Sequence, residues 1–258
     1  MFTYYIQNKI VMTKNFKIYS KYYDLLYKDK DYHSEANYVA KQLKLFVPKA
    51  KSILEFGSGT GGHGVLLQKK GFDVFGLDQS EEMVAEAKKR GLPCQTADIS
   101  RFKLKQKYDA VISLFHVIGY LTNNKDLTAT FQNAYKHLNK DGVFLFDLWY
   151  SPAVYEQKAV TRLKKIQNKE VAVTRIAEPH IDINNNIVDV RYTIFIKDIP
   201  TGKISEFEES HPVRHFSAPE IGLLAKLTGF EVIKSEEFLT GNQPSASTWG
   251  VCFILRKI

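Results

Sequence analysis

The sequence predicts an α/β fold, in which helices cover both faces of a mostly parallel sheet and a second, antiparallel sheet is inserted before the last strands. Three observations support this prediction. Short apolar runs alternate with amphipathic helical stretches between residues 51 and 147. A glycine-rich segment directly follows the first of these runs. After Pro152, apolar and polar residues alternate one by one, which is typical of antiparallel strands.

The composition is that of a globular protein. Of the 258 residues, 44% are hydrophobic and 25% are charged, which suits one domain with a well-formed core. Cys94 and Cys252 each lie in or beside an expected strand and have no neighbouring cysteine, so we interpret both as buried thiols in a reducing cytosol. Polar residues interrupt the apolar start of the chain, which resembles neither a signal peptide nor a membrane span. We therefore expect a cytoplasmic protein without membrane contact.

The formal net charge of +8 raises the question of nucleic-acid binding, because clustered lysine and arginine residues neutralise phosphates. The lysines of this chain are scattered instead. The densest runs, at 101–107 and 162–169, are short, and we interpret them as solvated faces rather than as a nucleic-acid site.

The elements of the main domain are expected in a regular order. A helical region rich in tyrosine comes first, and one later helix begins on Ser80, a residue type that accepts hydrogen bonds from the free amides of a first helical turn. The expected helices are at about 18–46, 61–70, 80–90, 125–138 and 218–228, and the expected strands are at 52–56, 73–77, 93–96, 109–113, 143–147, 230–234 and 248–256.

The inserted sheet divides the chain into three parts. We expect an N-terminal extension at 1–17, a main domain formed by 18–150 together with 217–258, and the antiparallel insert at 151–216. We expect the insert either to cover the acceptor site as a lid or to form a dimer contact. A monomer and a homodimer both remain open.

The segment ILEFGSGTGGHG, residues 53–64, is the first candidate binding site. Gly57, Gly59 and Gly62 follow a strand and open a helix, and Asp78 ends the next strand. Glycines let a ligand approach the backbone, and an acidic residue after the second strand accepts hydrogen bonds from ribose hydroxyls. Taken alone, this pattern predicts a dinucleotide site and an NAD-dependent oxidoreductase.

Two further carboxylates favour a different ligand. Glu55 lies two residues before the first glycine, where it would repel a pyrophosphate but attract an ammonium and a sulfonium. Asp98 follows the third strand, where it can accept from an adenine amino group, with Ile99 and Met83 placed to pack on the ring. S-adenosylmethionine is the ligand with these needs. The predicted cofactor set also includes Ser58, Thr60, Gln79 and Leu114.

These residues resemble the Rossmann-like, or class I, S-adenosylmethionine-dependent methyltransferases. The glycine segment, GLDQSEEM, TADI, YDAVISLFHVIGYL and LNKDGVFLFDLW occur in the usual order of that family. A narrower similarity, to the N,N-dimethyltransferases of nucleotide-linked amino sugars, is carried by YDLLYKDKDYHSEA at 23–36, GYL at 119–121 and LWYSP at 148–152. That resemblance implies that Tyr27 lines the acceptor pocket and that Tyr32 touches the cofactor.

The sequence departs from this narrower group in two places. PSASTW at 244–249 lacks an arginine where a pyrophosphate would need one. The insert also carries HPVRHF at 211–216, which matches no expected motif.

Methyl transfer from a sulfonium is an in-line displacement that needs no metal, so the catalytic candidates are residues that hold and shield the reactants. Tyr23, Tyr27 and Tyr32 can form an aromatic lid over the sulfonium, although their spacing also suits an amphipathic helix. His116, after the fourth strand, can take a proton from the acceptor, or it can be a hydrogen-bonded part of the cleft wall.

Two residues are candidates for binding the acceptor. Trp149, after the fifth strand, can provide an apolar wall for a flat ring, and core packing is the alternative. Arg214 can receive a phosphate or carboxylate, or it can lie on the exposed face of the insert.

Taken together, these residues predict a methyltransferase that acts on a small molecule. The main hypothesis is N-methylation of an amino sugar, free or nucleotide-linked, or of a related amine. O-methylation of a small hydroxylated metabolite and methylation of a nucleic acid are the alternatives. The segment after the fourth strand, from Ser113 to His116, lacks the acidic or asparagine residue and the two prolines that enzymes acting on base amines usually carry.

Overall fold

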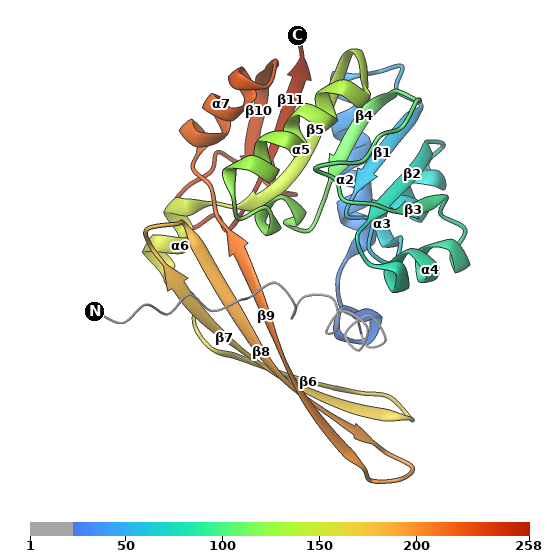
Figure 1. Ribbon diagram of the computed structural model, residues 1–258, viewed down its shortest axis with the longest axis vertical. Helices are drawn as coiled ribbons and strands as arrows, with labels where there is room; N and C mark the ends of the chain where they lie inside the picture. The colour runs from blue at the N-terminus through green and yellow to red at the C-terminus, as the bar shows by residue number, and fades with distance from the viewer. Residues whose placement is uncertain (1–22) are drawn as a thin grey trace.

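The computed structural model describes residues 23–258, and the expected N-terminal extension at 1–17 lies outside this range. The main body is a seven-stranded sheet with the order β10-β11-β5-β4-β1-β2-β3 (Figure 1). β1 is parallel to β2 and β4, β4 is parallel to β5, and β11 is antiparallel to both of its neighbours. The strands are β1 (Ser52–Phe56), β2 (Asp73–Asp78), β3 (Cys94–Thr96), β4 (Tyr108–Ser113), β5 (Leu138–Trp149), β10 (Phe230–Glu237) and β11 (Gly250–Lys257).

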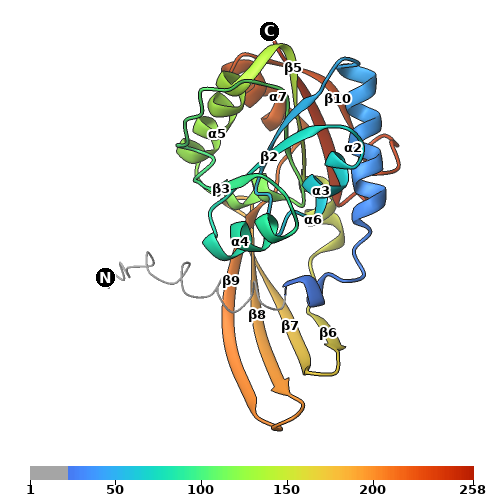
Figure 2. The same ribbon diagram turned by 90° about the vertical axis from the view of Figure 1, so that its right-hand side faces the viewer.

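Helices cover both faces of this sheet, as Figures 1 and 2 show. One face packs on α5 and α7, and the other packs on α2, α3 and α4, because side chains that alternate along each strand point to opposite faces. The helical elements are α2 (Tyr32–Phe46), α3 (Gly62–Gln68), α4 (Glu81–Lys89), the 3-10 helix η1 (Val117–Tyr120), α5 (Asn124–His137), α6 (Ser151–Gln157) and α7 (Ala218–Leu227).

Capping residues determine where several helices begin. The Ser80 hydroxyl accepts a hydrogen bond from the Met83 amide at 3.2 Å, as expected for the start of α4. The Asp31 carboxylate accepts from the Ser34 amide at 2.9 Å and starts α2 at Tyr32. The tyrosine-rich region is therefore interrupted: residues 23–26 form a separate helical turn before α2, rather than part of one helical region from 18 to 46.

The insert is a separate four-stranded antiparallel sheet with the order β6-β7-β8-β9. The α/β fold with an antiparallel insert is thus confirmed. The strands are β6 (Arg162–Gln167), β7 (Val171–Asp182), β8 (Ile187–Asp198) and β9 (Ile204–Arg214). The basic run at 162–169 contains β6, an edge strand in which only Ile166 is buried. Lys165 and Lys169 are exposed, whereas Lys164 is half-buried and donates to the Leu26 carbonyl at 2.6 Å.

Several contacts hold the insert against the main body. After β9, the Phe216 amide donates to the Trp149 carbonyl of β5 at 2.9 Å. η1 packs on β9 so closely that a Cβ atom on Gly119 would lie 2.7 Å from a Val213 methyl group. One end of the insert is thereby held near the carboxyl end of β4.

The segment before α2 packs on the insert as well. Leu26 is fully buried, and it belongs to a hydrophobic cluster with Ile166, Val173, Ile194 and Ile196 of the insert. Residues 23–27 therefore lie between the main body and the insert. None of the described helices is both long and apolar enough to cross a membrane.

The hydrophobic core beneath α5 can be tested by removing one ring. Phe131 is fully buried and contacts the rings of Phe144 and Phe146, with centroid distances of 5.3 and 5.4 Å. We expect Phe131→Ala to lower the free energy of unfolding by about 3–5 kcal/mol, because a cavity replaces these contacts. Urea denaturation measures this change. Leu223→Ala, at a position 62% exposed, should stay within about 0.5 kcal/mol of the wild type, and equal losses for the two variants would contradict the assignment of the core.

Candidate active site

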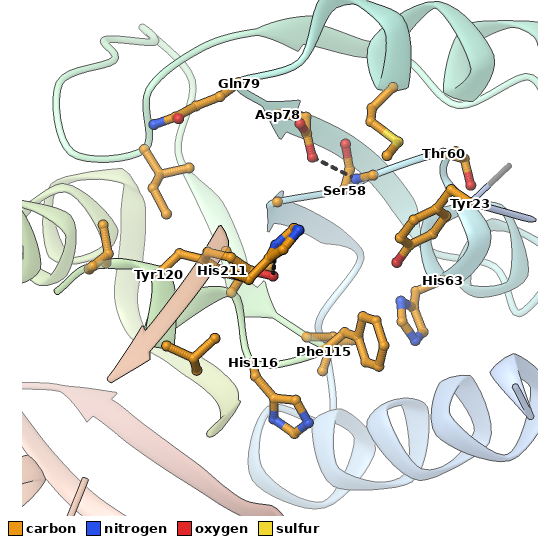
Figure 3. A pocket seen from close by; sticks show the side chains of 18 of the residues that line it. Tyr23, Ser58, Thr60, His63, Asp78, Gln79, Phe115, His116, Tyr120 and His211 are labelled. Atoms are coloured by element: carbon orange, nitrogen blue, oxygen red, sulfur yellow. Dashed lines mark hydrogen bonds between the residues drawn. The ribbon is translucent and has the colours of Figure 1, made fainter. Parts of the chain in front are cut away.

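A cavity of about 540 Å³ lies where β1, β2 and β4 end (Figure 3). The chain leaves β1 toward β2 on one side and returns to β4 on the other, and ligands of open α/β sheets bind where the strand order reverses in this way. Every site residue predicted from the sequence lines this cavity except Glu55 and Arg214.

The glycine loop forms the floor of the cavity. Gly57 and Gly59 have positive φ angles of 68° and 52°, which glycine adopts without strain. A Cβ atom on Gly57 would lie 2.5 Å from a Val117 methyl group, whereas one on Gly59 would meet no atom within 4 Å. Gly57 therefore allows close packing on η1, and Gly59 presents bare backbone to the cavity.

Asp78 holds this loop in place. Its Oδ2 atom accepts a hydrogen bond from the Gly59 amide at 2.8 Å, and its Oδ1 atom accepts from the Ser80 amide at 2.9 Å. Burial raises the pKa of the Asp78 carboxyl, and these backbone amides oppose the rise because they favour the charged form. Asp78 thus connects the glycine loop to the start of α4 and also lines the cavity.

Glu55 lies outside the cavity lining and is 1% exposed. Its Oε1 atom is 3.9 Å from Nδ1 of His63, and its Oε2 atom has no hydrogen-bond partner within residues 23–258. Burial, and then the charge of Asp78, raise the pKa of Glu55 to about 8. Nε2 of His63 contacts the Glu35 carboxylate at 2.6 Å, so a chain of polar side chains links Glu55 to α2.

The far end of the cavity combines a carboxylate with apolar side chains. Oδ1 of Asp98 accepts from the amide and the hydroxyl of Ser100, at 2.8 and 2.7 Å. Asp98 thus holds the local turn at Ser100 and also lines the cavity. Ile99 and Met83 are 6% and 4% exposed, and both line the cavity.

The three tyrosines meet at the entrance as one aromatic cluster. Tyr23 and Tyr27 have ring centroids 4.7 Å apart, and the Tyr27 ring meets Phe115 edge-on at 5.2 Å. Tyr32 packs over the glycine loop, where a Cβ atom on Gly62 would lie 2.7 Å from its ring. Burial is the main cause that raises the pKa of Tyr32 to about 12, so its hydroxyl stays protonated. Cations of the chain lie over two of these rings, since Lys30 Nζ is 4.9 Å from the Tyr32 centroid and the Arg175 guanidinium carbon is 5.6 Å from the Tyr27 centroid.

His116 follows β4 in a strained conformation. Both Phe115 and His116 have positive φ angles, 63° and 61°, which cost energy in residues other than glycine. Nδ1 of His116 lies 2.8 Å from Oδ2 of Asp147, an ion-pair distance, although the direction of the N–H is not that of a hydrogen bond. Asp147 is 1% exposed; burial alone would raise its pKa, but the His116 contacts outweigh this effect and lower it.

The insert provides a wall that the sequence did not predict in detail. Val190, Tyr192, His211 and Val213 line the cavity from β8 and β9, opposite residues of the main sheet. The unmatched motif HPVRHF contains His211 and was the one feature of the sequence that pointed to it. Its place in a site became clear only from the residues that line the cavity beside it.

Arg214 lies outside the cavity because the side chains of β9 point alternately to the two faces of the inserted sheet. His211 and Val213 point to the cavity, so Arg214 points to the other face. There its guanidinium donates to Glu220 at 2.6 Å and to Asn124 at 2.7 Å. These contacts connect the insert to α7 and α5, and the position of Arg214 offers no support for its predicted contact with the acceptor.

Comparisons with known proteins agree with this geometry. A family model described as a methyltransferase domain matches residues 32–235. A dTDP-3-amino-3,4,6-trideoxy-alpha-D-glucopyranose N,N-dimethyltransferase of Streptomyces venezuelae is 30% identical over 224 residues, which cover 85% of this chain and 91% of that protein. A glycine/sarcosine N-methyltransferase of Halorhodospira halochloris is 36% identical over 135 residues, covering 49% of this chain and 50% of that protein.

Solved structures show the same architecture. DesVI of Streptomyces venezuelae superposes with a TM-score of 0.78 at 26% identity, covering 93% of this chain and 98% of that chain. The sugar N-methyltransferase KedS8 of a Streptoalloteichus species superposes with a TM-score of 0.80 at 21% identity, covering 100% of this chain and 98% of that chain.

The buried carboxyl of Glu55 makes stability depend on pH. With a pKa of about 8 in the folded protein and 4.5 as the ordinary value, Glu55 keeps a proton that the unfolded chain releases. Its contribution to stability is complete below pH 4.5 and is lost as the pH rises toward 8, by up to about 1.4 kcal/mol per pH unit. We expect Glu55→Gln to remove this slope, as measured by urea unfolding at pH 5, 6.5 and 8.

The matched control is Glu231→Gln, at an exposed position of β10. This variant should follow the pH dependence of the wild type. If Glu55→Gln follows the same slope as well, Glu55 does not carry the buried proton.

Proposed function

Because the chain belongs to the S-adenosylmethionine-dependent methyltransferases, we propose that it methylates the amino nitrogen of a small molecule, most specifically of an amino sugar. The similarity to N,N-dimethyltransferases of dTDP-linked amino sugars supports this substrate class. The size of the cavity also supports a small-molecule substrate, since its volume of about 540 Å³ suits a small molecule.

The cofactor fits the residues of the glycine loop and the strand ends. S-adenosylmethionine, when bound, supplies a methyl group on a positively charged sulfur atom. The bare backbone at Gly59 accommodates a close ligand, and Asp78 and Asp98 offer carboxylates to its ribose and adenine. Ile99 and Met83 provide apolar contacts for the base. The remaining proposed contacts are Gly57, Ser58, Thr60, Gln79 and Leu114 in the lining, and Glu55 from beneath it.

The charge of the cavity also favours cationic ligands. Its lining, within the part of the chain that the structure describes, contains the carboxylates of Asp78, Asp98 and Asp126 but no lysine or arginine. The aromatic cluster of Tyr23, Tyr27 and Tyr32 adds electron-rich faces and excludes water from the entrance. We propose that the insert, 151–216, acts as a lid that completes the acceptor end.

The observation that carries the proposal is the contact of His116 with Asp147 in the cavity wall. An amine attacks through its lone pair and becomes positively charged, so it must lose a proton before it leaves as product. The His116 imidazole lines the cavity, and the buried Asp147 carboxylate stabilises the imidazolium that would form. Trp149, with its ring 5.8 Å from that of His116, limits the position of the acceptor.

A panel of acceptors tests the proposal directly. We expect transfer of a labelled methyl group to dTDP-linked amino sugars at a higher kcat/KM than to glycine or sarcosine, because the acceptor end of the cavity is aromatic. Hydroxy sugars without an amine should not accept the label. Transfer only to such hydroxy sugars would replace N-methylation by O-methylation, and transfer to no small molecule would overturn the proposal.

His116 can be tested separately. We expect His116→Asn to lower kcat by about a hundredfold with an amine acceptor, because the proton acceptor is lost, while the affinity for S-adenosylhomocysteine changes less than about twofold. Single-turnover kinetics and calorimetry measure the two quantities. Asp147→Asn should lower kcat in the same direction. A turnover equal to that of the wild type at every pH would remove the role of His116.

A further inference from the structure

η1 and β9 bring three polar side chains together in one hydrogen-bonded network at the acceptor end of the cavity. The Tyr120 hydroxyl lies 3.2 Å from Nδ1 of His211, and Nε2 of His211 lies 3.0 Å from Oε2 of Glu209. Glu209 and His211 are each 5% exposed, whereas Tyr120 is 45% exposed. Figure 3 shows the His211 ring projecting into the cavity with the Tyr120 hydroxyl beside it. The Glu209 carboxylate is thus the buried end of this network, and the Tyr120 phenol is its exposed end.

With Glu209 ionised and His211 neutral, the hydrogen bonds of these three side chains run in one direction. An ionised Glu209 can only accept, so Nε2 of His211 carries the proton and donates to it. In a neutral imidazole Nδ1 is then an acceptor, and the Tyr120 hydroxyl donates to it. The proton of Tyr120 is used in this way, and its oxygen lone pairs are left for a ligand. A ligand therefore meets a hydrogen-bond acceptor at this point, which selects for a donor.

The pairing of β8 with β9 fixes the positions of Glu209 and His211 in this network. His211 pairs with Val190 across β8 and β9, and Glu209 pairs with Tyr192. The Tyr192 ring lies against the His211 ring, with centroids 4.8 Å apart, so the imidazole cannot turn freely. A side chain that belongs to a strand of a regular sheet is held more precisely than one that belongs to a loop.

We propose that Tyr120, positioned by His211 and Glu209, binds a hydroxyl group of the acceptor that lies next to the amine to be methylated. This inference rests on the proposed function, which it narrows from amines to amino alcohols such as amino sugars. A hydroxyl suits the site because the neutral Tyr120 oxygen offers one hydrogen bond and no charge. The hydroxyl that contacts the acceptor belongs to the main domain, and the insert positions it through His211 and Glu209.

The test compares one dTDP-linked amino sugar, with hydroxyls on both carbons next to the amine, with its two monodeoxy analogues. Tyr120→Phe keeps the ring and removes only the hydroxyl. We expect it to lower kcat/KM by about tenfold for the parent acceptor and by less than about twofold for the analogue that lacks the recognised hydroxyl. His211→Asn should show the same dependence on the acceptor, and the double variant should lose little more than Tyr120→Phe alone.

The control is His180→Asn, at an exposed position of β7 in the same sheet, which should match the wild type with all three acceptors. Circular dichroism and S-adenosylhomocysteine binding show whether each variant is folded, and Tyr120→Phe, which leaves the packing intact, decides the question if His211→Asn is not. Equal losses for all three acceptors, or no loss for any, would overturn the role of Tyr120. Absence of methyl transfer by the wild type to every amine would overturn the proposed function and this inference together.

Discussion

The reversal of strand order between β1 and β4 is the constraint on which the rest of the structure depends. Because β2 and β4 pair with opposite edges of β1, the chains that leave β1 and β4 diverge and open a cavity above the sheet. The Asp78 carboxylate then keeps the glycine loop close to β2 through the Gly59 amide. The Ser58 amide also donates to the Leu77 carbonyl at 2.9 Å, so two hydrogen bonds join the loop to β2.

The cavity is completed by two segments from outside the parallel sheet. The turn at 23–26 is anchored on the insert by Leu26, which brings the tyrosine cluster to the entrance. η1 and β9 are in close contact at Gly119 and Val213, and side chains of β8 and β9 line the cavity together with His116. The insert therefore contributes to the shape of the cavity, through its contact with Leu26 and through the side chains of β8 and β9 in the lining.

Buried carboxylates recur around this cavity, and each has a different balance of forces. Glu55 has a distant histidine contact and an unpartnered oxygen, so burial raises its pKa. Asp147 is equally buried, but the adjacent His116 ring lowers its pKa below the usual range. The pKa of Glu55, with its histidine 3.9 Å away, is raised by burial and by the charge of Asp78, whereas the pKa of Asp147, 2.8 Å from His116, is lowered.

The sequence by itself determined the parallel sheet, its insert and most of the cofactor end, because hydrophobic periodicity, glycines and strand-end carboxylates are local signals. It predicted the position of Asp78 and Asp98 for this reason. Only the tertiary structure decided the acceptor end: the face of β9 that turns Arg214 away, the contact of Tyr120 with His211 and the burial of Glu55. Those features join residues far apart in the chain, and their geometry depends on how two sheets pack, which no local pattern records.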